Sequence, residues 1–354
     1  MDSQLSSKIL FIGIDYRNPI GGIASVENEY SKFIKPFKFI RTSSNTPQLE
    51  KALIVLEGLL KFTWTMLTDS NIKIVHVNAA SDASFWRKRI FISLAKIFNK
   101  KIVYHNHGGG FKRFTSQHPK AVQRTLAKVD CIVALSEDWA NFFNSQTSCQ
   151  NVKIIKNVVP LPQTKPLENG EHDTKKIMQL TFLGKITPEK GIYDLVELIA
   201  ENKDLYNGRI HLSIGGNGET AKLQKEIYSK GLENIVTFVG WVNGDKKEEL
   251  LNSTDVYVLP SYYEGLPISI LEAMAHKKAI ISTTVGGIPE IVIDSENGFL
   301  ITPGDKQALK CAIDKLLQDA TLRTKMGKNS FQKVQPYFPE NVDKSLCDLY
   351  QSLL

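Results

Sequence analysis

Two glutamates, Glu264 and Glu272, stand eight positions apart in SYYEGLPISILEAMAHKKAIISTTVGGIPEIV, residues 261–292. Glu264 precedes an expected helix start, and Glu272 falls two turns inside an apolar helical run. The amides of Gly265 and Leu266 would lie at the positive end of this helix, which suits an anion such as a diphosphate. A carboxylate beside that anion would repel it unless the carboxylate contacts another group. Sugar hydroxyls are the obvious partners. Glu272, about 1.5 Å per residue farther along, could reach a ribose.

The two acids could also have no binding role. Glu264 would then be a solvated loop residue, and Glu272 a residue of a core helix whose carboxylate reaches solvent. The lysines shift the balance. The stretch TFLGKITPEKGIYDLVELI, residues 181–199, places Lys185 at a strand end and Lys190 before a helix. Two such lysines can neutralise a diphosphate without a metal ion, although charged loops are also often merely solvated. Because no D-x-D motif is present to hold a metal-bound sugar nucleotide, we favour the phosphate-binding role.

The sequence lacks the motifs of several other classes of functional site. The sequence has no GxxxxGK[ST], no GxSxG and no HExxH motif, so no metal site is expected. The run IGGNGETAKL, residues 214–223, fits the dinucleotide fingerprint loosely. No acid ends the next strand, so a nucleotide-facing glycine turn of another class is favoured over an NAD site.

Length and composition bound the class of protein. The chain has 354 residues, 42% hydrophobic and 23% charged, which predicts a soluble protein of two domains. Its net charge of +7 suggests an anionic partner. Four cysteines without a CxxC pair are expected to be reduced thiols. The N-terminus lacks signal-peptide features and no apolar run is long enough to span a membrane, so we expect a cytoplasmic protein.

Short apolar strands alternate with helical segments, which predicts an α/β fold with parallel sheets. We expect an N-terminal doubly wound domain at 1–160, a proline-rich linker at 161–177 and a second doubly wound domain at 178–335. A helix at 336–354 is expected to pack back on the first domain. In such folds ligands bind outside the carboxyl ends of the strands, so we predict a site in the cleft between two facing domains.

The motifs GKITPEKG, GGNGE, VGW, PSYYEGLPISILEAMA, VGGIPEIV and NGFLITPGD, in this order, resemble the retaining, GT-B-fold enzymes of glycosyltransferase family 4. The spacing of Glu264 and Glu272 is similar to that family's E-x7-E signature. The likeness covers most of the second half of the chain. The first half matches more loosely, through Gly21–Gly22 and HGGGF at 107–111.

The resemblance implies a role for several positions. Glu264 would contact hydroxyls of the donor sugar near the reacting carbon, and His107 would hydrogen-bond that sugar. Glu272 would bind the ribose. The diphosphate-binding residues would be Lys185, Lys190, Gly22, Gly265 and Leu266. This sequence departs from the family at Lys185, where many relatives have Arg, and at Val158, where a glycine is usual.

We therefore expect a retaining, metal-independent glycosyltransferase that needs no cofactor. Its donor would be a nucleotide-diphosphate sugar, with UDP-sugars first and GDP-mannose second. Its acceptor would be a glycan or a lipid-linked molecule of bacterial surface polysaccharide. A nucleotide-sugar epimerase and a non-catalytic sugar-nucleotide binder are the alternatives. No nucleic-acid motif accompanies the positive charge, so nucleic acid is not an expected partner.

The segment FWRKRIFISLAKIFNKK, residues 85–101, carries six basic residues and no acid, with apolar residues at helical spacing. Such a helix suits the surface of an anionic membrane, here the inner face of the cytoplasmic membrane. An ordinary α/β helix, with its apolar stripe on the sheet and its lysines in water, is the alternative.

Overall fold

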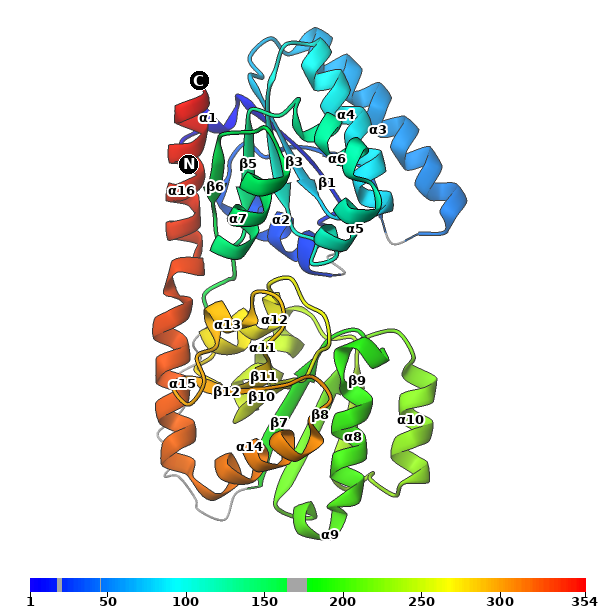
Figure 1. The fold of residues 1–354 in the computed structure, drawn as a ribbon, viewed down its shortest axis with the longest axis vertical. Helices are drawn as coiled ribbons and strands as arrows, with labels where there is room; N and C mark the ends of the chain where they lie inside the picture. Colours follow the sequence, from blue (N-terminus) through cyan, green and yellow to red (C-terminus); the bar gives the residue numbers. More distant parts are fainter. Residues whose placement is uncertain (18–20, 45, 164–176) are drawn as a thin grey trace. The chain divides into compact units, whose positions relative to one another are not determined.

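The computed structural model describes residues 1–17, 21–44, 46–163 and 177–354. The chain divides into two compact units, the first Met1–Val159 with Pro336–Leu354 and the second Pro160–Gln335. Each unit contains a six-stranded parallel sheet with helices on its faces (Figure 1). The predicted linker at 161–177 falls almost entirely outside the described residues. Among the helices described, none combines the length and the apolar character needed to cross a bilayer.

The first unit has the strand order β2-β1-β3-β4-β5-β6. Its strands read as nearly continuous apolar runs because both faces of the sheet are covered. The strands are β1 (Ile9–Gly13), β2 (Lys38–Arg41), β3 (Ile74–Ala79), β4 (Lys101–Asn106), β5 (Cys131–Ala134) and β6 (Val152–Ile154). The helices are α1 (Ser3–Ser6), α2 (Gly22–Phe33), α3 (Gln48–Thr68), α4 (Ala83–Ile97), α5 (Phe111–Gln117), α6 (Pro119–Leu126), α7 (Glu137–Gln146) and α16 (Pro339–Leu353).

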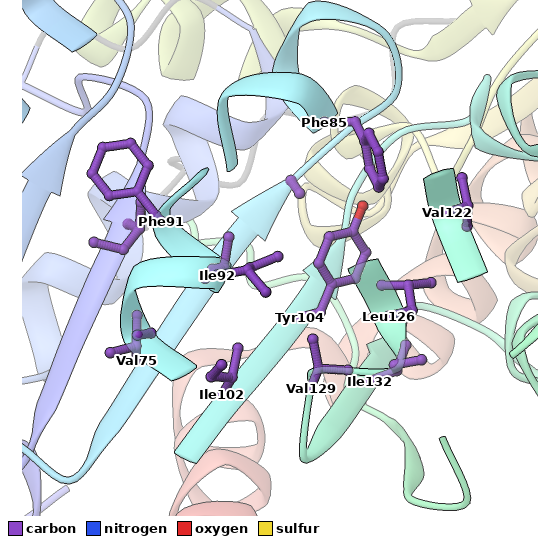
Figure 2. Packing of buried hydrophobic residues seen from close by; sticks show 14 of the residues in the cluster. Val75, Phe85, Phe91, Ile92, Ile102, Tyr104, Val122, Leu126, Val129 and Ile132 are labelled. Atoms are coloured by element: carbon purple, nitrogen blue, oxygen red, sulfur yellow. The ribbon is translucent and has the colours of Figure 1, made fainter. Parts of the chain in front are cut away.

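The core of this unit lies between the sheet and the helices α3 to α7, and Figure 2 shows the part to which α4 and α6 contribute. Phe85 and Phe91 of α4 are fully buried there, and the Phe91 ring meets Phe62 of α3 edge to face at 5.7 Å between centroids. Burial of each such ring stabilises the fold by about 1.5–3 kcal/mol. Helix α16 also packs on this unit, where the Tyr350 hydroxyl lies 2.8 Å from His76 Nδ1.

Several local predictions can be compared with these elements. In VDCIVALSEDWANFF, residues 129–143, the pattern indicates a strand, then Ser136 as a helix cap, and Ser136 does cap α7, because its side chain accepts a hydrogen bond from the Trp139 amide. The run KIVYHNHGGG, residues 101–110, indicates a buried strand that ends in polar and glycine-rich residues, and β4 ends there at Asn106. Strand β2 and helix α3 were not predicted. Strand β2 is four residues long and buries only Ile40, so its pattern is too short to stand out.

The second unit has the order β12-β11-β10-β7-β8-β9. Its strands are β7 (Met178–Leu183), β8 (Ile210–Gly215), β9 (Val236–Gly240), β10 (Val256–Leu259), β11 (Ala279–Thr283) and β12 (Gly298–Ile301). Its helices are η1 (Pro188–Lys190), α8 (Ile192–Glu201), α9 (Lys203–Tyr206), α10 (Thr220–Ser229), α11 (Gly244–Ser253), α12 (Ile268–Ala275), α13 (Ile288–Ile291), α14 (Lys306–Gln318) and α15 (Ala320–Val334), with η2 (Gln335–Tyr337) at the boundary.

The chain adds successive strands to this second sheet in one direction after β7 and in the opposite direction after β10. From β7 it winds outward through β8 and β9, and from β10 it winds the other way through β11 and β12. Neighbouring strands that wind in opposite directions form a topological switch point, where the loops at the carboxyl ends separate and leave room for a ligand. The loops that follow β7 and β10 carry Lys185, Lys190 and Glu264.

Candidate functional site

The loops after β7 and β10 meet through charged side chains. Lys190 Nζ donates to Glu264 Oε1 at 2.6 Å, and Ser261 Oγ donates to the same oxygen at 2.9 Å. The Glu264 side chain is only 9% exposed, so the lysine supplies the positive charge that a largely buried carboxylate requires. The structure thus brings together two of the predicted site residues.

Two glycines allow the backbones of these loops to approach. Gly191 and Gly286 both have positive φ, at 67° and 57°. A Cβ at Gly191 would lie 2.1 Å from the Pro260 carbonyl oxygen, and one at Gly286 would lie 2.1 Å from the Glu264 carbonyl oxygen. Only glycine fits either position. Close backbone packing therefore holds the loop after β10 at two points, Pro260 and Glu264.

The amides of Gly265 and Leu266 point to no protein acceptor within the described part of the chain. The Gly265 carbonyl is engaged, because it accepts from the Gly287 amide at 2.6 Å. Proline suits the first turn of a helix, but α12 starts at Ile268 and Pro267 is its extended cap residue. Gly265 and Leu266 consequently precede the helix and belong to the loop.

Glu272 lies in the middle of α12, where its side chain is also 9% exposed. Lys247 of α11 donates to Glu272 Oε1 at 2.6 Å. One turn later, His276 Nε2 lies 3.0 Å from Glu248 Oε2 of the same helix α11. Sequence reasoning missed Lys247, and nothing in the run DKKEELL distinguishes it from Lys246.

Lys185 is exposed and takes part in none of the ion pairs found among the described residues. It follows Gly184 at the end of β7. The glycine turn of 214–223 packs against this segment: Ile186 N donates to Asn217 O at 2.7 Å, and a Cβ at Gly216 would lie 1.9 Å from the Gly184 carbonyl oxygen. These glycines therefore shape the lysine loop by close packing.

His107 belongs to the first unit and follows β4. Its Nε2 lies 3.1 Å from Asn78 Oδ1, and the Asn78 amide in turn donates to Glu27 Oε1 at 2.9 Å. Burial lowers the pKa of His107 to about 4, so its imidazole is neutral at pH 7. A neutral ring facing an acceptor at Nε2 carries its proton there. Gly22 opens α2 in the same unit, directly after Gly21 with its φ of 94°.

Glu27 and Lys88 are buried beside this chain of hydrogen bonds. The Ile14 amide donates to Glu27 Oε2 at 2.9 Å, and Lys88 Nζ donates to Thr42 Oγ1 at 2.6 Å. Burial raises the pKa of Glu27 to about 8 and lowers the pKa of Lys88 to about 7. The prediction that Lys88 belongs to an exposed basic face was therefore wrong: the inner side of α4 carries it into the protein.

Neither buried residue was singled out from the sequence. The available signal for Glu27 was its place on the inner side of α2, three residues after Ala24 and three before Tyr30, both of which are buried. In the described part of the chain, no three His, Cys, Asp or Glu side chains gather as a metal-binding group.

Comparison with known proteins connects this geometry to a family. The model of the glycosyl transferases group 1 family matches residues 165–333. An uncharacterized glycosyltransferase of Methanocaldococcus jannaschii is 31% identical over 51% of this chain and 46% of its own. The O-antigen chain mannosyltransferase C of Escherichia coli is 27% identical over 72% of this chain and 69% of its own. The matches to the first three relatives span 46%, 64% and 64% of their lengths.

Solved structures share the fold over nearly the whole chain. Sucrose-phosphate synthase from Thermosynechococcus elongatus superposes with a TM-score of 0.78 at 20% identity, and covers 98% of each chain. The protein HepE of Anabaena, in complex with UDP-glucose, superposes with a TM-score of 0.76 at 18% identity, over 97% of this chain and 99% of its own. The fold is thus GT-B, with two Rossmann-like domains, and residues 165–333 match the glycosyl transferases group 1 family.

Proposed function

We propose that this protein transfers a sugar from a nucleotide-diphosphate sugar to a hydroxyl of its acceptor. The observation that carries the proposal is the Lys190–Glu264 pair at the switch point of the second sheet, beside two loop amides that donate to no acceptor among the described residues. Cations and free backbone amides can bind the oxygens of a diphosphate, and a carboxylate can accept hydrogen bonds from sugar hydroxyls. The match to the group 1 glycosyl transferases over residues 165–333 supports this class of reaction.

In this proposal the diphosphate lies against the amides of Gly265 and Leu266. Lys185 approaches it freely, since it has no ion-pair partner among the described residues. Lys190 has three N–H donors, so it can hold Glu264 and a phosphate oxygen together. Its contact with Glu264 thus agrees with a diphosphate role, because the lysine keeps the sugar-binding carboxylate compensated.

Glu272 and Lys247 form the proposed ribose site. The carboxylate keeps an oxygen for hydroxyl donors after Lys247 has bonded Oε1. Helix α12 holds Glu264 and Glu272 at a fixed separation because one lies before its start and the other in its second turn. That separation would set the distance between the sugar and the ribose of the donor.

We infer a retaining mechanism in which the acceptor hydroxyl attacks on the face that the diphosphate leaves. Lys185, Lys190 and the loop amides would stabilise the negative charge of the leaving group, which assigns this task to the protein rather than to a metal ion or cofactor. A leaving phosphate oxygen would take the acceptor proton. The neutral His107 and the loop at Gly22 are proposed to contact the donor from the first unit.

The proposed donor is a UDP-sugar, with GDP-mannose as second choice. Complexes of HepE with UDP and UDP-glucose support the first, and the mannosyltransferase of Escherichia coli supports the second. The proposed acceptor is a glycan or lipid-linked molecule of a bacterial surface polysaccharide, in line with relatives named for O-antigen and lipopolysaccharide core synthesis. We place the enzyme in the cytoplasm, at the inner face of the membrane.

A donor panel tests the proposal. The purified chain is incubated with UDP-glucose, UDP-galactose, UDP-N-acetylglucosamine and GDP-mannose together with a cell-envelope lipid extract, and free nucleotide and glycosylated product are measured. The Glu264→Gln variant should lose turnover while it still binds nucleotide, and Glu272→Gln should bind nucleotide more weakly. Nucleotide binding without product from any donor would favour a non-catalytic binder, and full turnover by Glu264→Gln would refute the assignment of the site.

A further inference from the structure

Helix α3 is apolar on two opposite sides. Ile54, Phe62 and Met66 are buried in the core of the first unit. The outer side carries five large apolar residues that are each more than half exposed: Leu53, Leu56, Leu60, Trp64 and Leu67. Their spacing of three or four residues places all five on one stripe, which we call the α3 stripe. A helix in water normally turns polar residues outward, so this stripe requires an explanation.

Helix α4 extends the exposed apolar surface. It lies beside α3 in the same unit, joined through the Phe62–Phe91 contact (Figure 1). Its own exposed apolar side chains are Trp86 at 39%, Ile90 at 45% and Ile97 at 76%. Arg89 lies over the Trp86 ring at 5.6 Å from the centroid. Two tryptophans and a neighbouring cation are typical of a surface that meets lipid headgroups.

The segment that includes α4, α5 and α6 carries charge of one sign, whereas α3 itself has the exposed acids Glu50 and Glu57. Residues 83–128, which include α4, α5 and α6, contain eleven Lys and Arg and no Asp or Glu. One of the eleven, Lys88, is buried, while Lys96, Lys120 and Arg124 are exposed. The first unit has 23 Lys and Arg against 14 Asp and Glu, a net +9, whereas residues 160–335 have 21 against 23, a net −2. The positive charge of the chain therefore belongs to the unit with the stripe.

The positive charge of the first unit indicates what binds to the α3 stripe. A second copy packed on the stripe would bring two units of net +9 together, which repulsion opposes. In an anionic bilayer, the acyl region can take up the apolar side chains of the stripe, and the negative headgroups attract the basic residues beside it. Because the inner side of α3 is buried in the protein core, the helix can only lie in the plane of the surface.

We propose that the α3 stripe, with the exposed apolar residues of α4 and the basic segment 83–128, docks the first unit on an anionic bilayer. This moves the contact predicted for residues 85–101 mainly to α3, a helix outside that segment. Docking would bring a lipid-linked acceptor to the proposed transfer site, but the binding itself does not depend on that function. The two proposals can therefore fail separately.

The test is co-sedimentation of the full chain with vesicles of phosphatidylcholine alone and of phosphatidylcholine with phosphatidylglycerol. We expect binding to the second kind that weakens with salt, because part of it is electrostatic. The variant Leu56→Gln/Leu60→Gln/Trp64→Gln should lower the partition constant about tenfold or more, since each side chain loses its apolar contact. The matched control Leu205→Gln/Tyr228→Gln replaces exposed apolar residues of the second unit and should bind as the parent does.

A second measurement locates the contact. Brominated lipid should quench the fluorescence of Trp64, and Trp64→Phe should remove most of the quenching. Thermal unfolding checks that each variant is folded. Absence of binding to both kinds of vesicle, or equal binding of the triple variant and the parent, would overturn the proposal. So would a dimer in light scattering that the triple variant converts to a monomer without loss of vesicle binding.

Discussion

The most direct test of the site's architecture is Gly286→Ala. Gly286 has a φ of 57°, and a Cβ there would lie 2.1 Å from the Glu264 carbonyl oxygen and 2.8 Å from that of Gly265. Real Cβ contacts stay above 3.0 Å, so one loop has to move by about 0.9 Å. The displaced atoms belong to the residue that we assign to the donor sugar.

Gly208 provides a matched control. Its φ is 71°, but no atom of the described residues lies within 4 Å of a Cβ built on it. It precedes β8 at the amino end of the strand, away from the site. Alanine at either position costs about 1 kcal/mol because of the left-handed backbone. Only Gly286→Ala adds the crowding term, about 1–3 kcal/mol, so its total should be roughly 2–4 kcal/mol.

Urea unfolding measures these differences, and sugar transfer measures the consequence for the site. A displacement of about 1 Å at a reacting centre costs about 100-fold in rate, so Gly286→Ala should lose that much while Gly208→Ala keeps the parent rate. Equal unfolding free energies and equal rates for the two variants would refute the inference that the Gly286 loop holds Glu264 in place.

Three further predictions concern charge and capping. Lys247→Met should lower the free energy of unfolding by about 3 kcal/mol because it leaves the Glu272 carboxylate unpaired, while the exposed neighbour Lys246→Met should stay within about 0.5 kcal/mol in the same urea titration. Folded Glu27 keeps its proton to about pH 8 and the unfolded chain loses it near 4.5, so the free energy of unfolding should fall as pH rises between these values. Glu27→Gln should flatten that decline, and an unchanged slope would contradict the burial of a protonated carboxyl. Ser136→Ala should cost about 1 kcal/mol in thermal unfolding through the lost cap of α7, and no change would show that the cap is not used.

Local pattern accounts for most of the strands. Runs such as ILFIG and IVHVNA indicate strands buried on both faces, and the structure has β1 and β3 there. Ser136 before Glu137 and Asp138 is a cap signal that depends only on neighbouring residues. The pattern failed for β2, whose four residues bury one side chain, and for α3, whose apolar residues lie on two opposite sides of the helix and not on one.

Side-chain partners were less accessible to prediction. The sequence singled out Lys190, Glu264 and Glu272 by residue type and spacing, but not which groups pair. Lys247 looks like its neighbour Lys246 until α11 packs beside α12. Lys88 looks like one more surface lysine until the rotation of α4 on the sheet buries it near Glu27.

The sequence by itself therefore determined which functional groups are present: two acids eight positions apart, two lysines and glycine-rich loops in an alternating α/β chain. Only the tertiary structure decided that β7 and β10 are neighbours, which joins Lys190 to Glu264 across 74 positions of the chain. Local patterns arise from the period of a helix or strand, a property of a few successive residues. Strand order and helix rotation are set by burial of the whole core, to which every element contributes.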